Sequence, residues 1–126
     1  MSDLLLNSFF TIRDIQYDED SPERLTAHLE LIPTHDIYKG HFPENPVVPG
    51  VCIVEMIKET LAQHFDKELV LVTAEEIKFL NLINPNEHPE LELEIKIKYP
   101  GDELMHAQVV VKIDEHVFTK FRGSFR

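Results

Sequence analysis

The stretch Tyr38–Glu55 reads YKGHFPENPVVPGVCIVE and joins a proline-rich loop to the start of a helix. Pro49 and Gly50 mark the boundary, because a proline–glycine pair interrupts regular structure. Apolar residues then recur at helical spacing, which is the pattern of a helix with one buried face. These residues are Ile53, Val54, Ile57, Leu61 and Phe65, and the helix is predicted to end near Asp66 to Glu68.

The opposite side of this helix is predicted to be polar. Its residues are Glu55, Lys58, Glu59, Ala62 and Gln63. A stripe of this kind would be solvated on a surface helix, but it would equally suit a contact between subunits or the mouth of a substrate tunnel. The sequence leaves these alternatives open.

Strands are predicted on both sides of the helix. On the N-terminal side, residues 9–17 are rich in residues that favour strands, and residues 25–31 alternate apolar with polar side chains. A long connection with three prolines, residues 34–49, follows. On the C-terminal side the predicted strands are residues 69–83 in two pieces, 91–99, 105–113 and a last strand after 116, with turns at 85–87, 100–102 and 114–116.

These elements predict one domain, residues 1–126, of the α+β class. Its centre would be an antiparallel sheet of about six strands packed on a single helix. One helix barely covers the apolar face of such a sheet. We therefore expect a homodimer or a higher oligomer.

The composition excludes several classes of protein. A net charge of −11 disfavours a nucleic-acid partner, because affinity for phosphates comes mainly from basic side chains. No apolar run approaches the roughly 20 residues of a membrane span, and the first residues lack the basic leader of a signal peptide. The single cysteine, Cys52, fits a reducing compartment. The sequence predicts a cytoplasmic protein.

Neither a metal nor another cofactor is predicted. No two histidines share a face with a third ligand at metal-binding spacing. Cys52 falls in the first turn of the helix, where a lowered thiol pKa is conceivable, but no basic partner is evident in the sequence. A small packed side chain is the favoured interpretation of Cys52. The scattered histidines are His28, His35, His64, His88, His106 and His116.

His41 and Glu55 are suited to acid–base chemistry. Histidine titrates near neutrality and is suited to act as a general base. A carboxyl in an apolar setting can remain protonated and is suited to act as a general acid. A backbone N–H at a helix N-terminus would stabilise negative charge on a substrate oxygen, and Gly50 would let a substrate approach.

The stretch from Gly40 to Glu55 resembles the signature of the bacterial 3-hydroxyacyl-[acyl-carrier-protein] dehydratases. That signature reads G-H-F-P-x-x-P-V-x-P-G-V and is followed by a helix with an acidic residue. Every fixed position is filled here, and Glu55 stands fourteen residues after His41, as in the family. The resemblance continues more weakly at Ile77-Lys78-Phe79 and Pro85-Asn86-Glu87, which look like the family's A-R-F and P-G-D segments.

The resemblance implies a hot-dog fold, in which the sheet wraps around a central helix, and a substrate carried by acyl carrier protein. It implies that His41 is the base and that Glu55 of the partner subunit is the acid. The Gly50 amide would hold the thioester carbonyl, and the backbone carbonyl of Val47 would orient the histidine. A glutamate acid resembles the branch of the family that only dehydrates, whereas an aspartate marks the branch that also isomerises.

Three departures from the family leave the acyl chain length, the pathway and the carrier open. Glu44 replaces a common glycine, and Glu59 replaces the glutamine usual four residues after the acid. The N-terminal Pro-His/Tyr-Pro-Phe-Leu-Leu motif is not found. The absence of this motif suggests a specialised lipid or polyketide-like pathway, and the sequence does not decide between carrier protein and coenzyme A.

Other functions remain as alternatives. A histidine in a proline-rich loop is ordinarily a turn residue, and Glu55 could belong to a solvated stripe. A hot-dog acyl thioesterase would use a carboxylate against the thioester carbonyl. A subunit that only binds acyl thioesters would need neither His41 nor Glu55.

The last predicted strand carries a local basic patch. Alternation places Lys120, Arg122 and Arg126 on the face opposite the apolar residues. A plain solvated edge would show the same pattern. Because carrier proteins are acidic, we expect this patch to be the docking surface in a protein that is otherwise strongly negative.

Overall fold

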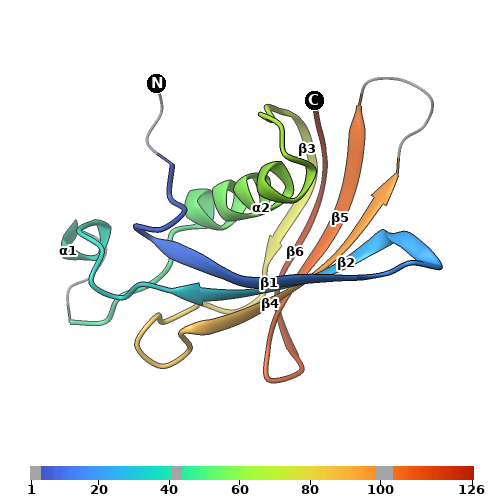
Figure 1. Ribbon diagram of the computed structural model, residues 1–126. Coiled ribbons are helices and arrows are strands. Elements are labelled where there is room, and N and C mark those ends of the chain that lie inside the picture. The colour runs from blue at the N-terminus through green and yellow to red at the C-terminus, as the bar shows by residue number, and fades with distance from the viewer. Residues whose placement is uncertain (1–3, 41–43, 99–103) are drawn as a thin grey trace.

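The computed structural model describes residues 4–40, 44–98 and 104–126. Figure 1 shows a curved sheet with a long helix lying against its concave face. Along the described chain the elements are β1 (Phe10–Asp18), β2 (Ser21–Leu31), α1 (Ile37–Gly40), α2 (Gly50–Phe65), β3 (Leu71–Phe79), β4 (Glu90–Lys98), β5 (Met105–Ile113) and β6 (His116–Phe125).

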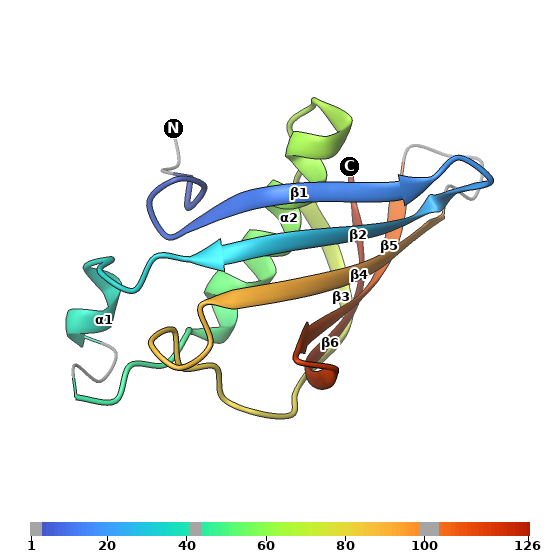
Figure 2. The same cartoon turned by 60° about the horizontal axis from the view of Figure 1, so that its bottom comes forward.

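The six strands form one antiparallel sheet in the order β1-β2-β4-β5-β6-β3. Figure 2 shows β1, β2 and β4 crossing in front of α2, so that the sheet wraps around the helix. The predicted α+β class with one central helix is confirmed. The predicted Tyr99 end of β4 and the turn at 100–102 lie outside the described residues.

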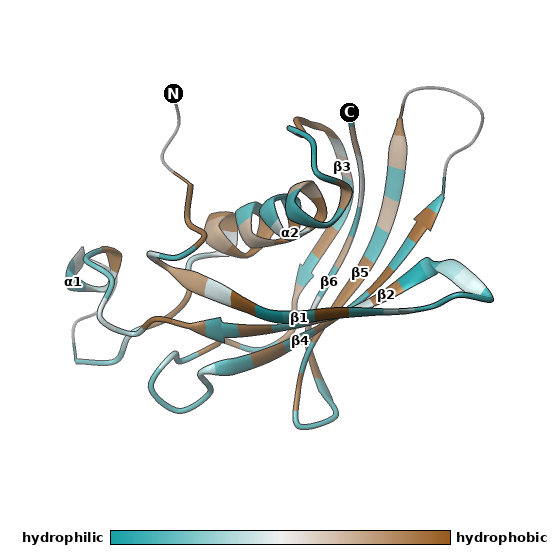
Figure 3. Cartoon of the chain, viewed as in Figure 1, coloured by the Kyte–Doolittle hydropathy of each residue, from teal (hydrophilic) through white to brown (hydrophobic). Residues whose placement is uncertain are grey.

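The core forms because alternating residues of the strands face α2. Leu25, Ile95, Val109 and Phe121 stand opposite one another in β2, β4, β5 and β6, and all four are buried. Figure 3 shows the corresponding alternation of apolar and polar residues along the strands. The apolar face of α2 completes the core through Ile53, Ile57 and Leu61.

Helix α2 begins and ends where the sequence predicts. Pro49 has extended backbone angles, φ −63° and ψ 143°, and Gly50 is the first helical residue. At the other end Asp66 adopts the left-handed conformation with φ 52°, and its amide donates to the Ala62 carbonyl. This conformation stops the helix, because left-handed residues do not continue a right-handed one.

The prediction of an unbroken connection over residues 34–49 was incomplete, because it missed α1. The Ile37 amide donates to Nδ1 of His35 at 3.0 Å, and this contact satisfies a free donor in the first turn. Tyr38 is buried against the ring of Phe9, with 5.5 Å between the ring centroids. A four-residue helix has too few positions to show helical periodicity in a sequence.

The strand β3 is an exposed edge of the sheet. It pairs only with β6 among the described strands, and all but one of its residues are exposed. Large apolar side chains on and beside it remain in contact with solvent, notably Val70, Val72, Phe79 and Leu82. An edge of this kind is a template for pairing with another strand.

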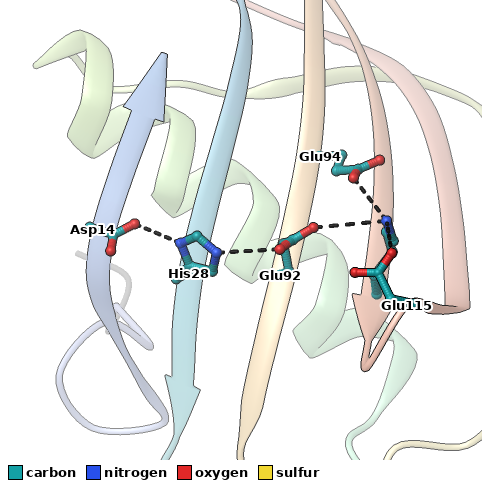
Figure 4. Close-up of polar contacts among 6 residues, drawn as sticks. Asp14, His28, Glu92, Glu94 and Glu115 are labelled. Carbon is teal, nitrogen blue, oxygen red and sulfur yellow. Dashed lines mark hydrogen bonds and ion pairs between the residues drawn. The ribbon is translucent and has the colours of Figure 1, made fainter. Parts of the chain in front are cut away.

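The outer face of the sheet, turned away from α2, carries a row of charged side chains (Figure 4). His28 Nδ1 lies 2.7 Å from Asp14, and Nε2 lies 3.3 Å from Glu92. Lys112 continues the row, with Nζ 3.9 Å from Glu92 and 2.9 Å from Glu94. The hydrogen bond that His28 Nδ1–H donates to Asp14 is the main cause that raises the pKa of His28.

Candidate active site at the start of the central helix

His41 lies outside the described residues, together with Phe42 and Pro43. Its role therefore stays a prediction. The described chain reaches Gly40 at the end of α1 and continues at Glu44, four residues after it. The described part of the predicted site consists of Val47, Gly50 and Glu55.

The N-terminus of α2 presents free backbone donors. The amides of Cys52 and Ile53 both donate to the Pro49 carbonyl, at 2.9 and 3.2 Å. No side chain caps this end, and the Gly50 and Val51 amides have no acceptor among the described residues. Free amides at a helix N-terminus favour negative charge. This end of α2 can therefore stabilise an oxyanion.

Gly50 lies beneath an aromatic ring of β3. A Cβ atom at this position would lie 2.7 Å from Cζ of Phe79, which is closer than carbon atoms approach. The Phe79 side chain is 50% exposed, and its ring can turn away from an added Cβ. Packing therefore does not by itself require a glycine at this position.

Val47 is half-buried in the loop before α2. The next amide, that of Val48, donates to the Ile83 carbonyl at 2.9 Å and fixes this part of the loop. The carbonyl of Val47 accepts no hydrogen bond from the described residues. It is therefore available to a group such as a histidine N–H.

Glu55 lies one and a half turns into α2, and its side chain is 32% exposed. Its Oε2 lies 3.3 Å from Nζ of Lys58 on the same helix. The carboxyl is thus neither fully solvated nor buried. It is accessible to a substrate that reaches this face of the helix.

The prediction of a polar stripe is wrong in part at Glu59, which lies one turn further along α2. Its side chain is only 4% exposed, so the stripe is not solvated along its whole length. Oε2 accepts the Leu5 amide at 3.0 Å and Oε1 accepts the Leu6 amide at 2.8 Å. Burial raises the pKa of Glu59, a hydrogen bond with Glu55 raises it further, and the two amides lower it.

Cys52 is buried, and burial raises the pKa of its thiol. The favoured interpretation of Cys52 as a small packed side chain agrees with this burial. Burial likewise raises the pKa of Tyr38. The Tyr38 hydroxyl has no hydrogen-bond partner among the described residues.

Within residues 4–40, 44–98 and 104–126, no three His, Cys, Asp or Glu side chains are grouped as a metal site. No helix in the same ranges has the length and apolar character needed to cross a bilayer.

The predicted basic patch is part of a larger groove on the outer face of the sheet. The groove has a volume of about 590 Å³, and its cations are Arg24, Lys96, Lys120 and Arg122. Arg24 stands directly opposite Lys96 in the pairing of β2 with β4. None of the four forms an ion pair within the described part of the chain. Arg126 is exposed but does not line the groove.

Comparisons with known proteins identify the family to which this chain is related. Residues 16–118 match the model of the ApeI-like family, described as ApeI dehydratase. The 3-hydroxyacyl-[acyl-carrier-protein] dehydratase FabZ of Thermotoga petrophila is 28% identical over 110 residues, which cover 82% of this chain and 77% of that protein. The matched family segment contains both His41 and Glu55.

Solved structures confirm the hot-dog fold. The dehydratase heterocomplex ApeI:P from Xenorhabdus doucetiae gives a TM-score of 0.68 at 19% identity and covers 90% of this chain and 95% of that one. Cj0977, a sigma28-regulated virulence protein from Campylobacter jejuni, gives 0.66 at 13% identity and covers 94% and 75%. At these identities the likeness concerns the fold alone.

Proposed function

Because this chain belongs to the ApeI-like dehydratase family, we propose that it removes water from a 3-hydroxyacyl thioester held on acyl carrier protein. The product is the trans-2-enoyl thioester, in a fatty-acid-like or specialised lipid or polyketide pathway. The observation that carries this proposal is the family match over residues 16–118, which contains the whole signature from Gly40 to Glu55.

In the proposed reaction His41 takes the C2 proton, and Glu55 of the partner subunit gives a proton to the hydroxyl leaving C3. Negative charge develops on the thioester oxygen, and the free Gly50 amide at the N-terminus of α2 stabilises it. The Val47 carbonyl accepts the other ring N–H of His41 and so sets the tautomer. No cofactor takes part.

Incubation of the protein with a 3-hydroxyacyl thioester tests this function. Conjugated enoyl absorbance supports dehydration, whereas release of free thiol would identify a thioesterase. Binding of the substrate with neither product would identify a subunit that only binds acyl thioesters. Short and long chains, each on carrier protein and on coenzyme A, define the substrate in the same assay.

Charge reversal of Lys120 and Arg122 to Glu is expected to raise the apparent KM for a carrier-bound substrate several-fold. Turnover of a small thioester analogue should not change. Like charges opposed across strands destabilise a sheet, so the unneutralised Arg24–Lys96 pair beside these residues favours an anionic partner. The effect should weaken at high salt, because added salt shortens the screening length below the about 8–10 Å of physiological ionic strength and so reduces electrostatic attraction between the partners.

The exposed Lys67, which follows α2, provides the control for charge reversal. Lys67→Glu makes the net charge more negative but lies outside the basic groove, so its KM should be nearly unchanged. Equal losses on carrier-bound and small substrates would mean that β6 was damaged. No loss on either would place the docking surface elsewhere.

We expect the protein to form a stable homodimer at micromolar concentration. The exposed edge and apolar side chains of β3 support pairing between strands of two subunits. Sedimentation velocity measures the mass directly. A monomer at these concentrations would contradict both the dimer and the proposed site shared between subunits.

A further inference from the structure

We propose that Glu59 is a positioning residue that shares one proton with Glu55 and fixes the direction of the Glu55 carboxyl. This inference rests on the proposed function of Glu55 as the acid of the reaction. Glu59 replaces the family's usual glutamine, so a pair of carboxyls stands where that family has an acid and an amide.

The first step of the argument is the burial of Glu59. It is the one charged residue in the core among the described residues, with 4% of its surface exposed. An ionised carboxylate in such a place is strongly unfavourable unless it is neutralised or hydrogen-bonded. Its environment therefore determines the protonation state that it can adopt.

Two backbone amides hold the Glu59 carboxyl in a fixed orientation. Leu6 donates to Oε1 at 2.8 Å, and Leu5 donates to Oε2 at 3.0 Å. A tight turn fixes these donors, because the Phe9 amide donates to the Leu5 carbonyl at 2.7 Å and the Asn7 amide donates to the Phe10 carbonyl at 2.6 Å. The carboxyl cannot rotate without losing both bonds.

Glu55 lies four residues before Glu59, so the two side chains are neighbours on the same face of α2. Burial and the neighbouring Glu55 carboxyl both raise the pKa of Glu59, which favours one proton held between the two carboxyls. On its other side the Glu55 carboxyl contacts the Lys58 ammonium at 3.3 Å. Glu55 is thus held from two sides, by a cation and by a carboxyl that is itself held by the backbone.

The charged and titratable groups near the pair do not remove the need for a shared proton. Lys58 contacts Glu55 and not Glu59. The thiol of Cys52 has a raised pKa and is neutral near pH 7. The remaining groups line the groove beside Glu59 and belong to the segment after α2, namely Asp66, Lys67 and Glu68.

Two carboxyls that share one proton titrate as a unit in two separated steps. Loss of the last proton is opposed, because it places two negative charges side by side. The singly protonated pair therefore persists to a higher pH than a lone carboxyl would. In that form the pair can supply the proton that leaves with the C3 hydroxyl.

Glu59→Gln tests this role through the pH dependence of kcat/KM. A glutamine keeps a donor for Glu55 but adds no second charge, so the alkaline limb should move to lower pH by about one unit or more. The acid limb, which reports the base, should stay in place. Above the alkaline limb, the loss of activity should reach about tenfold.

Thr60→Val is the matched control, because Thr60 is buried on the same turn and its hydroxyl donates only to the Met56 carbonyl, at 2.7 Å. Both limbs should be unchanged in this variant, whatever happens to its stability. An unchanged alkaline limb in Glu59→Gln would overturn the proposal and leave Glu59 as a tether for residues 5–6.

Carboxyl carbon NMR titration of the wild-type protein, labelled at glutamate, provides a test that needs no altered side chain. The Glu59 carboxyl should report two linked titration steps. An independent single step would overturn the shared proton. This measurement does not depend on turnover, so an absence of dehydratase activity would count against the proposed function and not against the pair.

Discussion

His41→Ala and Glu55→Gln are each expected to lower the rate of dehydration by roughly 100-fold or more, which is the scale for loss of a positioned base or acid. Glutamine keeps the shape of Glu55 but cannot give a proton, so the loss should appear in kcat with little change in KM. Steady-state kinetics on a 3-hydroxyacyl thioester measures both constants. A loss smaller than about threefold for either variant would contradict its assigned role.

Mixing the two inactive proteins should restore activity, because the proposed site combines His41 of one subunit with Glu55 of the partner subunit. After complete subunit exchange, half of the dimers contain both variants, and each has one intact site of two. Recovery of about a quarter of wild-type activity is expected in a two-fold symmetric dimer. No recovery after confirmed exchange would place both residues of the site in one subunit.

Gly123→Ala is expected to lower the free energy of unfolding by about 3 kcal/mol, the upper range for overpacking a core. Gly123 lies in β6 between Ala107 of β5 and Ala74 of β3. A Cβ atom there would lie 2.5 Å from the carbonyl oxygen of Thr73 and 2.7 Å from Cζ of Phe121. Since the oxygen belongs to the backbone, β3 itself would have to move.

Urea denaturation followed by circular dichroism measures this loss. At a strand position with room for a Cβ atom, Gly→Ala raises stability slightly. A decrease in the free energy of unfolding would therefore identify the steric conflict. Gly40→Ala is the control, because no atom lies within 4 Å of the added Cβ at that site. A decrease of less than about 0.5 kcal/mol for Gly123→Ala would show that β3 moves at little cost.

Most strands and the long helix could be predicted because their signals are local. Residues 91–98 alternate without interruption, and Pro49-Gly50 marks the start of α2 to the residue. The short helix α1 was missed because it depends on a contact from His35 and on the burial of Tyr38. Neither this contact nor this burial produces a periodic pattern in the sequence.

The site was less predictable, because it depends on contacts between distant residues. Glu59 was assigned to a polar stripe from its position on the helix, yet the amides that hold it lie 53 and 54 residues earlier in the chain. No property of residues 4–6 indicates that they would reach the helix. The only signal was the replacement of the family's glutamine, which marked the position without explaining it.

The exposed edge of β3 has a consequence for the newly made chain. Along β3, each copy of the chain presents to other molecules a strand edge that is unpaired among the described residues and carries apolar side chains. The net charge of −11 makes copies of the chain repel one another at distances longer than hydrogen bonds act. Charge thus slows indiscriminate association of this edge, and high salt should make freshly synthesised chains more prone to aggregate.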